Sequence, residues 1–166
     1  MSNILTLDYE TSDSRVNHGQ VLQAGIIISD DKLNVKSKHE MRCRLKPNVI
    51  PAVGACMVHK IPVNILKNSN KSHYQMVLEH YNLIKHNTPT VVMGFNQVAF
   101  DLEFYRRMLF KSLIPDVYQT NTNGNKHLDI LNVVRAAKFA KEDSIKTILI
   151  LENLIIFKMY IFMIIR

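Results

Sequence analysis

Apolar residues in the first part of the chain occur in short, dense runs that predict β-strands. Residues 3–9 and residues 21–29 are each a largely apolar run of strand length, and each predicts a buried strand. The polar residues 30–32 (Asp-Asp-Lys) predict a turn, and residues 34–45 then predict a third strand with a polar face. A proline-containing connection, residues 47–62, follows. Three strands are therefore expected to open the fold.

The second part of the chain alternates between helical and strand patterns. Residues 72–86 predict a helix, because apolar positions recur there at helical spacing. Residues 90–94 predict a short buried strand. Residues 101–110 predict a helix with acidic residues in its first turn, where the interaction of their negative charge with the helix dipole is favourable. A polar loop precedes a last predicted helix, residues 128–139. This order of elements predicts an α/β domain.

Length and charge agree with one domain that has a polyanionic partner. A chain of 166 residues supports one core, and its formal net charge of +7 suits nucleic acid. A solvated edge strand would also explain the alternating basic residues between Lys36 and Lys46. The two cysteines lack the spacing of a zinc site. An acidic pair appears by residue 10, before a signal-peptide core could form, so we expect a cytoplasmic protein.

Three carboxylates are the candidate chemistry of this chain. Asp8 and Glu10 lie two apart in the first predicted strand, so their side chains are expected on the same face. Asp101 follows at the start of a predicted helix. Magnesium prefers oxygen ligands, and paired divalent ions can clamp both oxygens of a phosphodiester displacement. The competing interpretation is a solvated strand end, since such acidic pairs also arise by chance; Asp101 and Glu103 form a second one.

Four segments, in order, resemble the DEDD-type 3′→5′ exonucleases, and specifically bacterial exonuclease I. They are Asp8-Tyr9-Glu10-Thr11, the segment 50–62, the segment 94–107 with its Asn96-x-x-x-Phe100-Asp101 pattern, and the segment 127–136. The resemblance covers roughly residues 1–142. It implies a ribonuclease H-like fold, a mixed β-sheet flanked by helices, incomplete here at its C-terminal side.

The resemblance also implies an activity. Such enzymes hydrolyse single-stranded DNA from the 3′ end with two Mg²⁺ ions, for which Mn²⁺ can substitute, and release 5′-mononucleotides in DNA repair and recombination. Asp8, Glu10 and Asp101 match the catalytic metal ligands. We expect a monomer that binds single-stranded DNA and no membrane, and that lacks the further domains of the intact family.

Substrate-binding positions follow from the same resemblance, and each has a structural alternative. The positions that match are Thr11, His59, Asn96 and Phe100, with Asp129 as a possible further residue near the site. Asn96 could instead cap the following helix. Phe100 could belong to the core, and a lone histidine such as His59 is often structural. Tyr9 should be buried on the strand face opposite the acids.

Two departures from the family pattern bear on activity. Lys60 stands where the family usually has a glycine that allows close backbone approach. The third motif of the family, a histidine general base five residues before an aspartate, has no counterpart: none of the seven histidines is followed by an acidic residue at that spacing. We therefore expect a weakly active or inactive form. A non-catalytic module that binds DNA 3′ ends is the alternative.

The last segment differs from the rest of the chain. Residues 145–166 contain eight isoleucines and no Gly, Ala, Pro or Val. We expect residues 1–143 to be a partial exonuclease domain and residues 144–166 an aberrant apolar tail produced by a frameshift or truncation. A membrane anchor is the alternative, because residues 147–165 are about long enough to cross a bilayer. Glu152, Asn153 and Lys158 argue against it.

Overall fold

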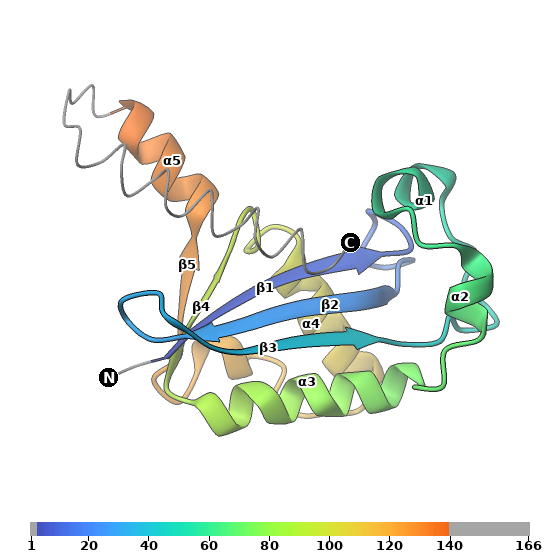
Figure 1. Cartoon of the computed structure of the whole chain (residues 1–166), viewed down its shortest axis with the longest axis horizontal. Helices are drawn as coiled ribbons and strands as arrows, with labels where there is room; N and C mark the ends of the chain where they lie inside the picture. Colours follow the sequence, from blue (N-terminus) through green and yellow to red (C-terminus); the bar gives the residue numbers. More distant parts are fainter. Residues whose placement is uncertain (1–2, 140–166) are drawn as a thin grey trace.

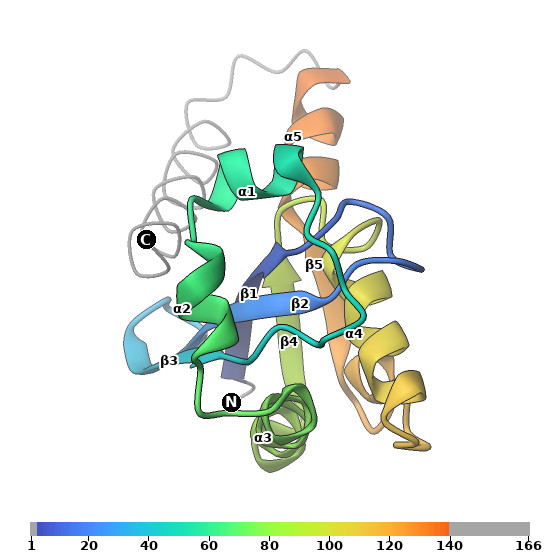
Figure 2. The same cartoon turned by 90° about the vertical axis from the view of Figure 1, so that its right-hand side faces the viewer.

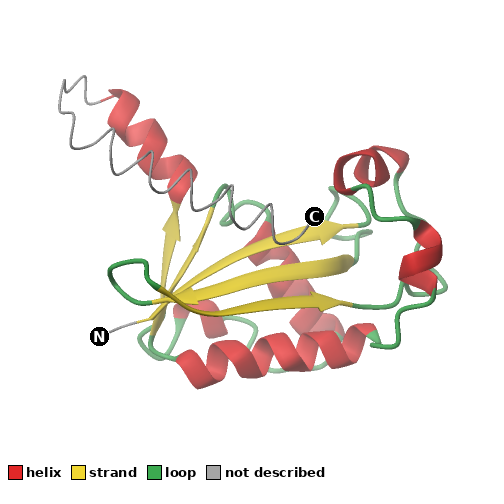
Figure 3. Ribbon diagram, viewed as in Figure 1, coloured by secondary structure: helices red, strands yellow, loops and turns green. Residues whose placement is uncertain are grey.

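The structure, a computed structural model, describes residues 3–139. In that part of the chain, five strands form one mixed sheet in the order β3-β2-β1-β4-β5 (Figures 1 and 3). β1 pairs antiparallel with β2, and β2 with β3, whereas β4 and β5 continue the sheet in parallel. The strands are β1 (Asn3–Thr11), β2 (Val21–Ser29), β3 (Val35–Arg42), β4 (Thr90–Gly94) and β5 (Lys126–Asp129).

Helices flank the sheet on both sides. α3 and α1 lie on opposite sides of the strands in Figures 1 and 2. α4 packs with α3 in the main hydrophobic core, and α2 contributes Leu66 to a second, smaller cluster. The helices are α1 (Val53–His59), α2 (Val63–Lys67), α3 (His73–Asn87), α4 (Asp101–Lys111) and α5 (Ile130–Phe139), with a short 3₁₀ turn, η1 (Gln119–Asn121).

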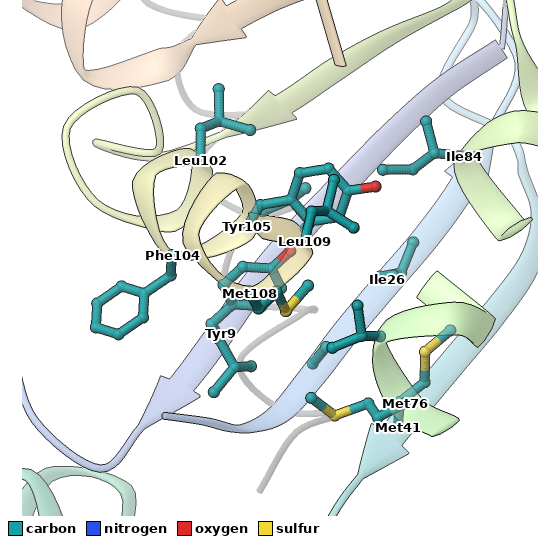
Figure 4. Close-up of a cluster of buried hydrophobic side chains, with 14 of the residues drawn as sticks. Tyr9, Ile26, Met41, Met76, Ile84, Leu102, Phe104, Tyr105, Met108 and Leu109 are labelled. Carbon is teal, nitrogen blue, oxygen red and sulfur yellow. The ribbon is translucent and has the colours of Figure 1, made fainter. Parts of the chain in front are cut away.

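One face of β1 packs into the hydrophobic core, and the other carries Asp8 and Glu10. Leu5, Leu7 and Tyr9 belong to the main core together with side chains of α3 and α4. Figure 4 shows Tyr9 within this cluster. Burying each large apolar side chain contributes about 1.5–3 kcal/mol. The strand period of two then fixes Asp8 and Glu10 on the opposite face. A register slip of one residue would bury both acids in the core, so the core sets where the acids lie.

Most predicted elements are present. β2 and β4 have the predicted bounds, β1 extends two residues further than predicted, and β3 is shorter. α3 begins one residue after Ser72, which forms a capping box with Gln75: Gln75 N donates to Ser72 Oγ (3.2 Å) and Ser72 N to Gln75 Oε1 (2.8 Å). That motif places the start of the helix close to where the apolar spacing predicted it.

Two local predictions were wrong. Leu128 and Asp129 were expected to open the last helix but belong to β5, because they pair with Met93 and Gly94 of β4. Strand pairing across the chain overrode the local helical pattern there. The connection 47–62 was predicted only as a proline-containing link, but it contains the short helix α1.

The expectations for residues 144–166 concern a segment outside the described residues. Within residues 3–139, no helix is long and apolar enough to cross a bilayer.

A polar contact is buried where β1, α3 and α4 meet. The Tyr9 hydroxyl lies 3.1 Å from Nδ1 of His80, and the His80 ring meets Tyr105 edge-on at 4.7 Å between centroids. Tyr9 is 5% exposed and His80 is fully buried, so the expected burial of Tyr9 is confirmed. Burial lowers the pKa of His80 to about 3, so the ring is neutral in the folded protein.

We predict that acid destabilises the fold through this histidine. Below about pH 6.5, the usual histidine pKa, the unfolded chain takes up a proton that the folded protein does not accept until the pH approaches about 3. Stability is therefore complete above that range and falls as the pH drops through it, by up to about 1.4 kcal/mol per pH unit. Urea unfolding at several pH values measures the slope.

The double variant Tyr9→Phe/His80→Phe removes both polar partners and should flatten this dependence. His86→Gln, an exposed change on the same helix, is the matched control and should keep it. Equal slopes in the two variants would contradict the assignment.

Candidate functional site

The candidate site is built on the C-terminal half of β1. Asp8 and Glu10 share the face of the strand opposite Tyr9. Asp8 is half-buried, and Glu10 is 7% exposed. Both residues have interactions within the protein. The strand thus presents two carboxylates side by side, as its alternation predicts.

Asp101 joins this pair across a long stretch of chain. Its Oδ1 accepts a hydrogen bond from the backbone N–H of Tyr9 at 3.1 Å, although the two residues are 92 positions apart. The peptide nitrogen of Tyr9 lies in the backbone between Asp8 and Glu10. A hydrogen bond to a charged acceptor contributes about 1.5–3 kcal/mol, so this contact fixes the start of α4 against the acidic strand.

The loop before α4 holds Asp101 in place. Gln97 is buried, and its Nε2 donates to the carbonyl oxygens of Val92 in β4 (2.8 Å) and Leu128 in β5 (3.1 Å). Gly94 permits this approach, since a Cβ there would lie 2.9 Å from the Gln97 side chain. The loop is therefore anchored on the sheet before the helix begins.

Asp129 completes that anchor. Its Oδ1 accepts hydrogen bonds from the backbone N–H groups of Asn96 (2.9 Å) and Leu131 (3.0 Å), and its Oδ2 accepts one from Val98 (3.1 Å). The carboxylate is 8% exposed and is engaged by the protein backbone. Asp129, predicted as a possible site residue, thus positions the loop that carries Asp101.

Asn96 does not cap the following helix. α4 begins at Asp101, its N-cap is Phe100, and no side-chain cap hydrogen bond is made. Asn96 has a φ of 58°, a left-handed conformation that asparagine tolerates better than most residues. The capping alternative is wrong because the residue instead turns the chain between β4 and α4.

A hollow of about 350 Å³ opens beside the carboxylates. It lies between the end of β1, the loop after it, α1 and the residue before α4. Four predicted site residues share its lining: Glu10, Thr11, His59 and Phe100. Asp8, Asn96 and Asp101 are not part of that lining. The apolar wall comes from α1, within the segment 50–62 that the resemblance had singled out. Ala55 and Val58 were not predicted individually, although their spacing of three residues is helical.

His59 ends α1 and is held in one orientation. Its Nδ1 accepts the backbone N–H of Ile61 at 2.9 Å, and burial lowers the pKa of the ring below its usual value. A neutral imidazole that accepts at Nδ1 carries its proton on Nε2. That Nε2 is buried and has no hydrogen-bond partner in the described part of the chain. One of the residues that line the hollow therefore carries a buried donor that no group within residues 3–139 satisfies.

Lys60 occupies the position where the family pattern has glycine. It is the C-cap of α1, with φ 57° and ψ 18°, and its N–H donates to the carbonyl of Cys56. This is the left-handed C-cap conformation that glycine adopts most easily. The lysine keeps the turn at a cost of about 1–2 kcal/mol, and its side chain is exposed.

Phe100 and Thr11 each have a structural contact in addition to their place in the hollow. Phe100 is partly buried against the main core, with its ring 5.0 Å from that of Phe104. Thr11 donates its hydroxyl to the carbonyl of Asp13 at 3.0 Å. The core role weighed for Phe100 is therefore present, and the same ring also lines the hollow.

Metal binding by these carboxylates stays a prediction. Within residues 3–139, no three His, Cys, Asp or Glu side chains come together in an arrangement that could hold a metal ion. Mg²⁺ commonly binds through one or two carboxylates, several waters and substrate phosphates, so the Asp8–Glu10 pair matches that donor chemistry. These residues are therefore suited to an ion that the substrate helps to coordinate. In the described part of the chain, they do not form a complete set of metal ligands without it.

Comparisons with known proteins agree with the motifs. No protein-family model matches the chain. The sequence is similar to exodeoxyribonuclease I of Buchnera aphidicola subsp. Acyrthosiphon pisum, with 25% identity over 135 residues, which are 81% of this chain and 32% of that protein. It is also similar to exodeoxyribonuclease I of Escherichia coli K12, with 23% identity over 146 residues, 87% of this chain and 30% of that one. The chain thus spans about a third of the length of these curated relatives.

The structure is similar to solved structures of E. coli exonuclease I. A complex with a dT13 oligonucleotide matches with a TM-score of 0.81 and 23% identity, over 87% of this chain and 31% of that chain. A product-bound structure matches with a TM-score of 0.81 and 24% identity, over 87% and 34%. The expected ribonuclease H-like fold, a mixed sheet flanked by helices, is confirmed, as is the resemblance to exonuclease I.

We predict that Asp129 stabilises the loop between β4 and α4 and thereby keeps Asp101 in position. Asp129→Ala removes the acceptors of three backbone N–H groups and should destabilise the protein by about 2–4 kcal/mol. Amide hydrogen exchange at Asn96 and Val98 should accelerate more than exchange in β2. Asp116→Ala, a partly buried acid in the connection after α4, is the control and should leave both amides protected. Unchanged exchange at Asn96 in Asp129→Ala would rule out this role.

Proposed function

We propose that this chain carries the nuclease domain of a 3′→5′ exonuclease that acts on single-stranded DNA. The observation that carries the proposal is the Asp101–Tyr9 hydrogen bond, which joins the third carboxylate to the strand of the other two. The adjacent hollow, with its unsatisfied His59 donor, supplies a place for the terminal nucleotide. Two of the relatives are named exodeoxyribonuclease I, and one matched structure holds an oligonucleotide, which supports DNA as the substrate.

We propose that Asp8 and Glu10 hold a divalent cation, Mg²⁺ with Mn²⁺ as a substitute, together with a substrate phosphate, and that Asp101, fixed to the same strand through Tyr9, joins the ligand set only when ion and phosphate are bound. Such an ion would polarise the phosphodiester and lower the pKa of water. The protein side chains would do the rest. Phe100 offers a ring face to the terminal base, and Nε2 of His59 donates a hydrogen bond to the nucleotide. Asp129 and Gln97 keep Asp101 in position.

We expect this chain to hydrolyse DNA slowly. The family's general base is a histidine five residues before an aspartate, and no histidine of this sequence meets that spacing. Absence of a general base costs about 10²–10⁴-fold in rate. His59 does not substitute for it in this proposal, because its Nδ1 is taken by Ile61 and its Nε2 carries a proton. The same proposal places the protein in DNA repair and recombination, as a cytoplasmic monomer.

A second candidate is a module that binds DNA 3′ ends without cleaving them. It is favoured by the missing general base and by the lack, within residues 3–139, of a three-residue metal group. The hollow and His59 would serve this function equally well. The two candidates differ only in whether bound DNA is shortened.

We predict feeble, metal-dependent shortening of single-stranded DNA by the full chain. With a 3′-labelled strand and Mg²⁺ or Mn²⁺, mononucleotide release should be about 10²–10⁴-fold slower than is ordinary for enzymes, and a chelator should stop it. Asp8→Asn should abolish release, whereas Asp31→Asn, an exposed acid of the β2–β3 turn, should not. Release that survives Asp8→Asn would contradict the catalytic assignment. Binding without release would favour the second candidate.

We predict that His59 recognises the strand end. His59→Asn keeps an acceptor near the position of Nδ1 for Ile61 but removes the Nε2 donor, so the unfolding free energy should change little. The Kd for a strand with a free 3′ end should rise about 3- to 10-fold, as expected for one neutral hydrogen bond. Binding of a circular single strand, which has no end, is the internal control and should not change. An equal loss for both substrates would show that His59 acts on the fold.

A further inference from the structure

A second hollow, about 320 Å³ in volume, is lined by positive charge. It lies between the β1–β2 connection, the segment after β3, the start of α3 and the outer face of α4. Lys46, Arg107 and Lys111 supply the charge, and His73 contributes a neutral imidazole to the wall. Among its described lining residues, none is acidic. It shares no lining residue with the hollow beside the carboxylates.

Two of the cations are held by side-chain hydrogen bonds, and the backbone of the third, Lys46, is fixed. Arg107 and Lys111 are one turn apart on α4, so they project from the same face, and both donate to Asn17: Arg107 to its side-chain oxygen and Lys111 to its carbonyl at 3.2 Å. Gln20 fixes the opposite wall, because its Oε1 accepts the N–H of Lys46 at 2.9 Å. The basic groups are therefore parts of a built surface.

Close approach of the β1–β2 connection to α4 forms the hollow. A Cβ on Gly19 would lie 2.8 Å from the carbonyl oxygen of Asp13 and 2.8 Å from the ring of Phe104. Only glycine allows this contact without movement of the loop or the ring. The acid of this loop, Asp13, is engaged by Arg15 at 2.7 Å and is not part of the lining.

The positive groups repel one another and lack an anionic partner in the described part of the chain. His73 is 7% exposed, and its ring makes no hydrogen bond to residues 3–139. Burial and, to a smaller extent, the nearby charges of Lys46 and Lys111 together lower its pKa to about 4. The pKa of Lys46 is also lowered, by burial and then by Lys111. Solvated surface lysines would spread apart, whereas these converge on one partly enclosed space.

We propose that this hollow binds a phosphate group. Phosphate offers several strong acceptor oxygens and would relieve the repulsion between Lys46 and Lys111, with Arg107 as a bidentate donor. The volume falls in the range of small-ligand sites, about 300–1,000 Å³. The phosphate comes either from a nucleic-acid strand or from a free phosphate ion. Because the site uses none of the carboxylates, its test does not depend on the proposed hydrolysis.

The experiment compares two charge-matched double variants of the full chain. Lys46→Gln/Lys111→Gln removes two cations from the hollow, and Lys32→Gln/Lys85→Gln removes two exposed cations elsewhere. Binding of a circular single-stranded oligonucleotide avoids any contribution from a 3′ end. Inorganic phosphate is titrated separately into the unmodified chain and followed through the NMR resonances of the His73 ring. Urea unfolding checks that both variants are folded.

If a strand supplies the phosphate, the Kd for the circular oligonucleotide should rise about tenfold in the hollow variant and less than about threefold in the control. The logarithmic slope of Kd against salt concentration should become shallower by about 0.7 for each phosphate that the hollow variant no longer neutralises. If the site takes free phosphate, the ion should shift the His73 resonances and raise the pKa of its ring while oligonucleotide binding stays equal in both variants. Equal oligonucleotide binding with no response of His73 to phosphate would overturn the proposal.

Discussion

The hydrogen bond from the Tyr9 N–H to the Asp101 carboxylate is the contact on which the candidate site depends. It connects the acidic strand to a helix that begins 92 residues later, and it does so from the backbone, so it does not require any particular side chain on β1. The contact forms only if the turn before α4 has its observed shape. Gln97 fixes that shape by donating to carbonyl oxygens of β4 and β5, and Asp129 fixes it by accepting hydrogen bonds from the loop backbone. The geometry of the acids is thus supported by the order of the parallel strands.

The two faces of β1 carry different kinds of residue: one face contributes to the core, and the other carries the candidate catalytic acids. One face of β1 carries Leu5, Leu7 and Tyr9 into the core, where the Tyr9–His80 contact adds a specific polar interaction. The opposite face carries the acids. Because alternation is strict along a strand, the hydrophobic core holds the acids in register without touching them. The core therefore makes two carboxylates adjacent on a surface where their mutual repulsion alone would separate them.

The connection between β1 and β2 lies between two hollows of different chemistry. Ser14 lines the hollow that contains Glu10 and His59, and the following residues, from Val16 onward, line the basic one. A polyanionic strand would be repelled by acids in the absence of a cation and attracted by the lysines and arginine of the second hollow. The net charge of +7 favours such a partner overall, but only the fold gathers a few of those charges into one place.

The first four strands, the shared face of Asp8 and Glu10, the burial of Tyr9 and the resemblance to exonuclease I could all be predicted from the sequence. These depend on local periodicity or on motifs that are contiguous in the chain. Three features became visible only in the folded protein: Leu128 and Asp129 form a strand, the Asp129 carboxylate binds the loop backbone, and Asn96 does not cap α4. The fold also brought Lys46, His73 and Lys111 into one hollow. Such features depend on pairing between β4 and β5 and on contacts between distant segments, and no local pattern of residues encodes which segments will meet.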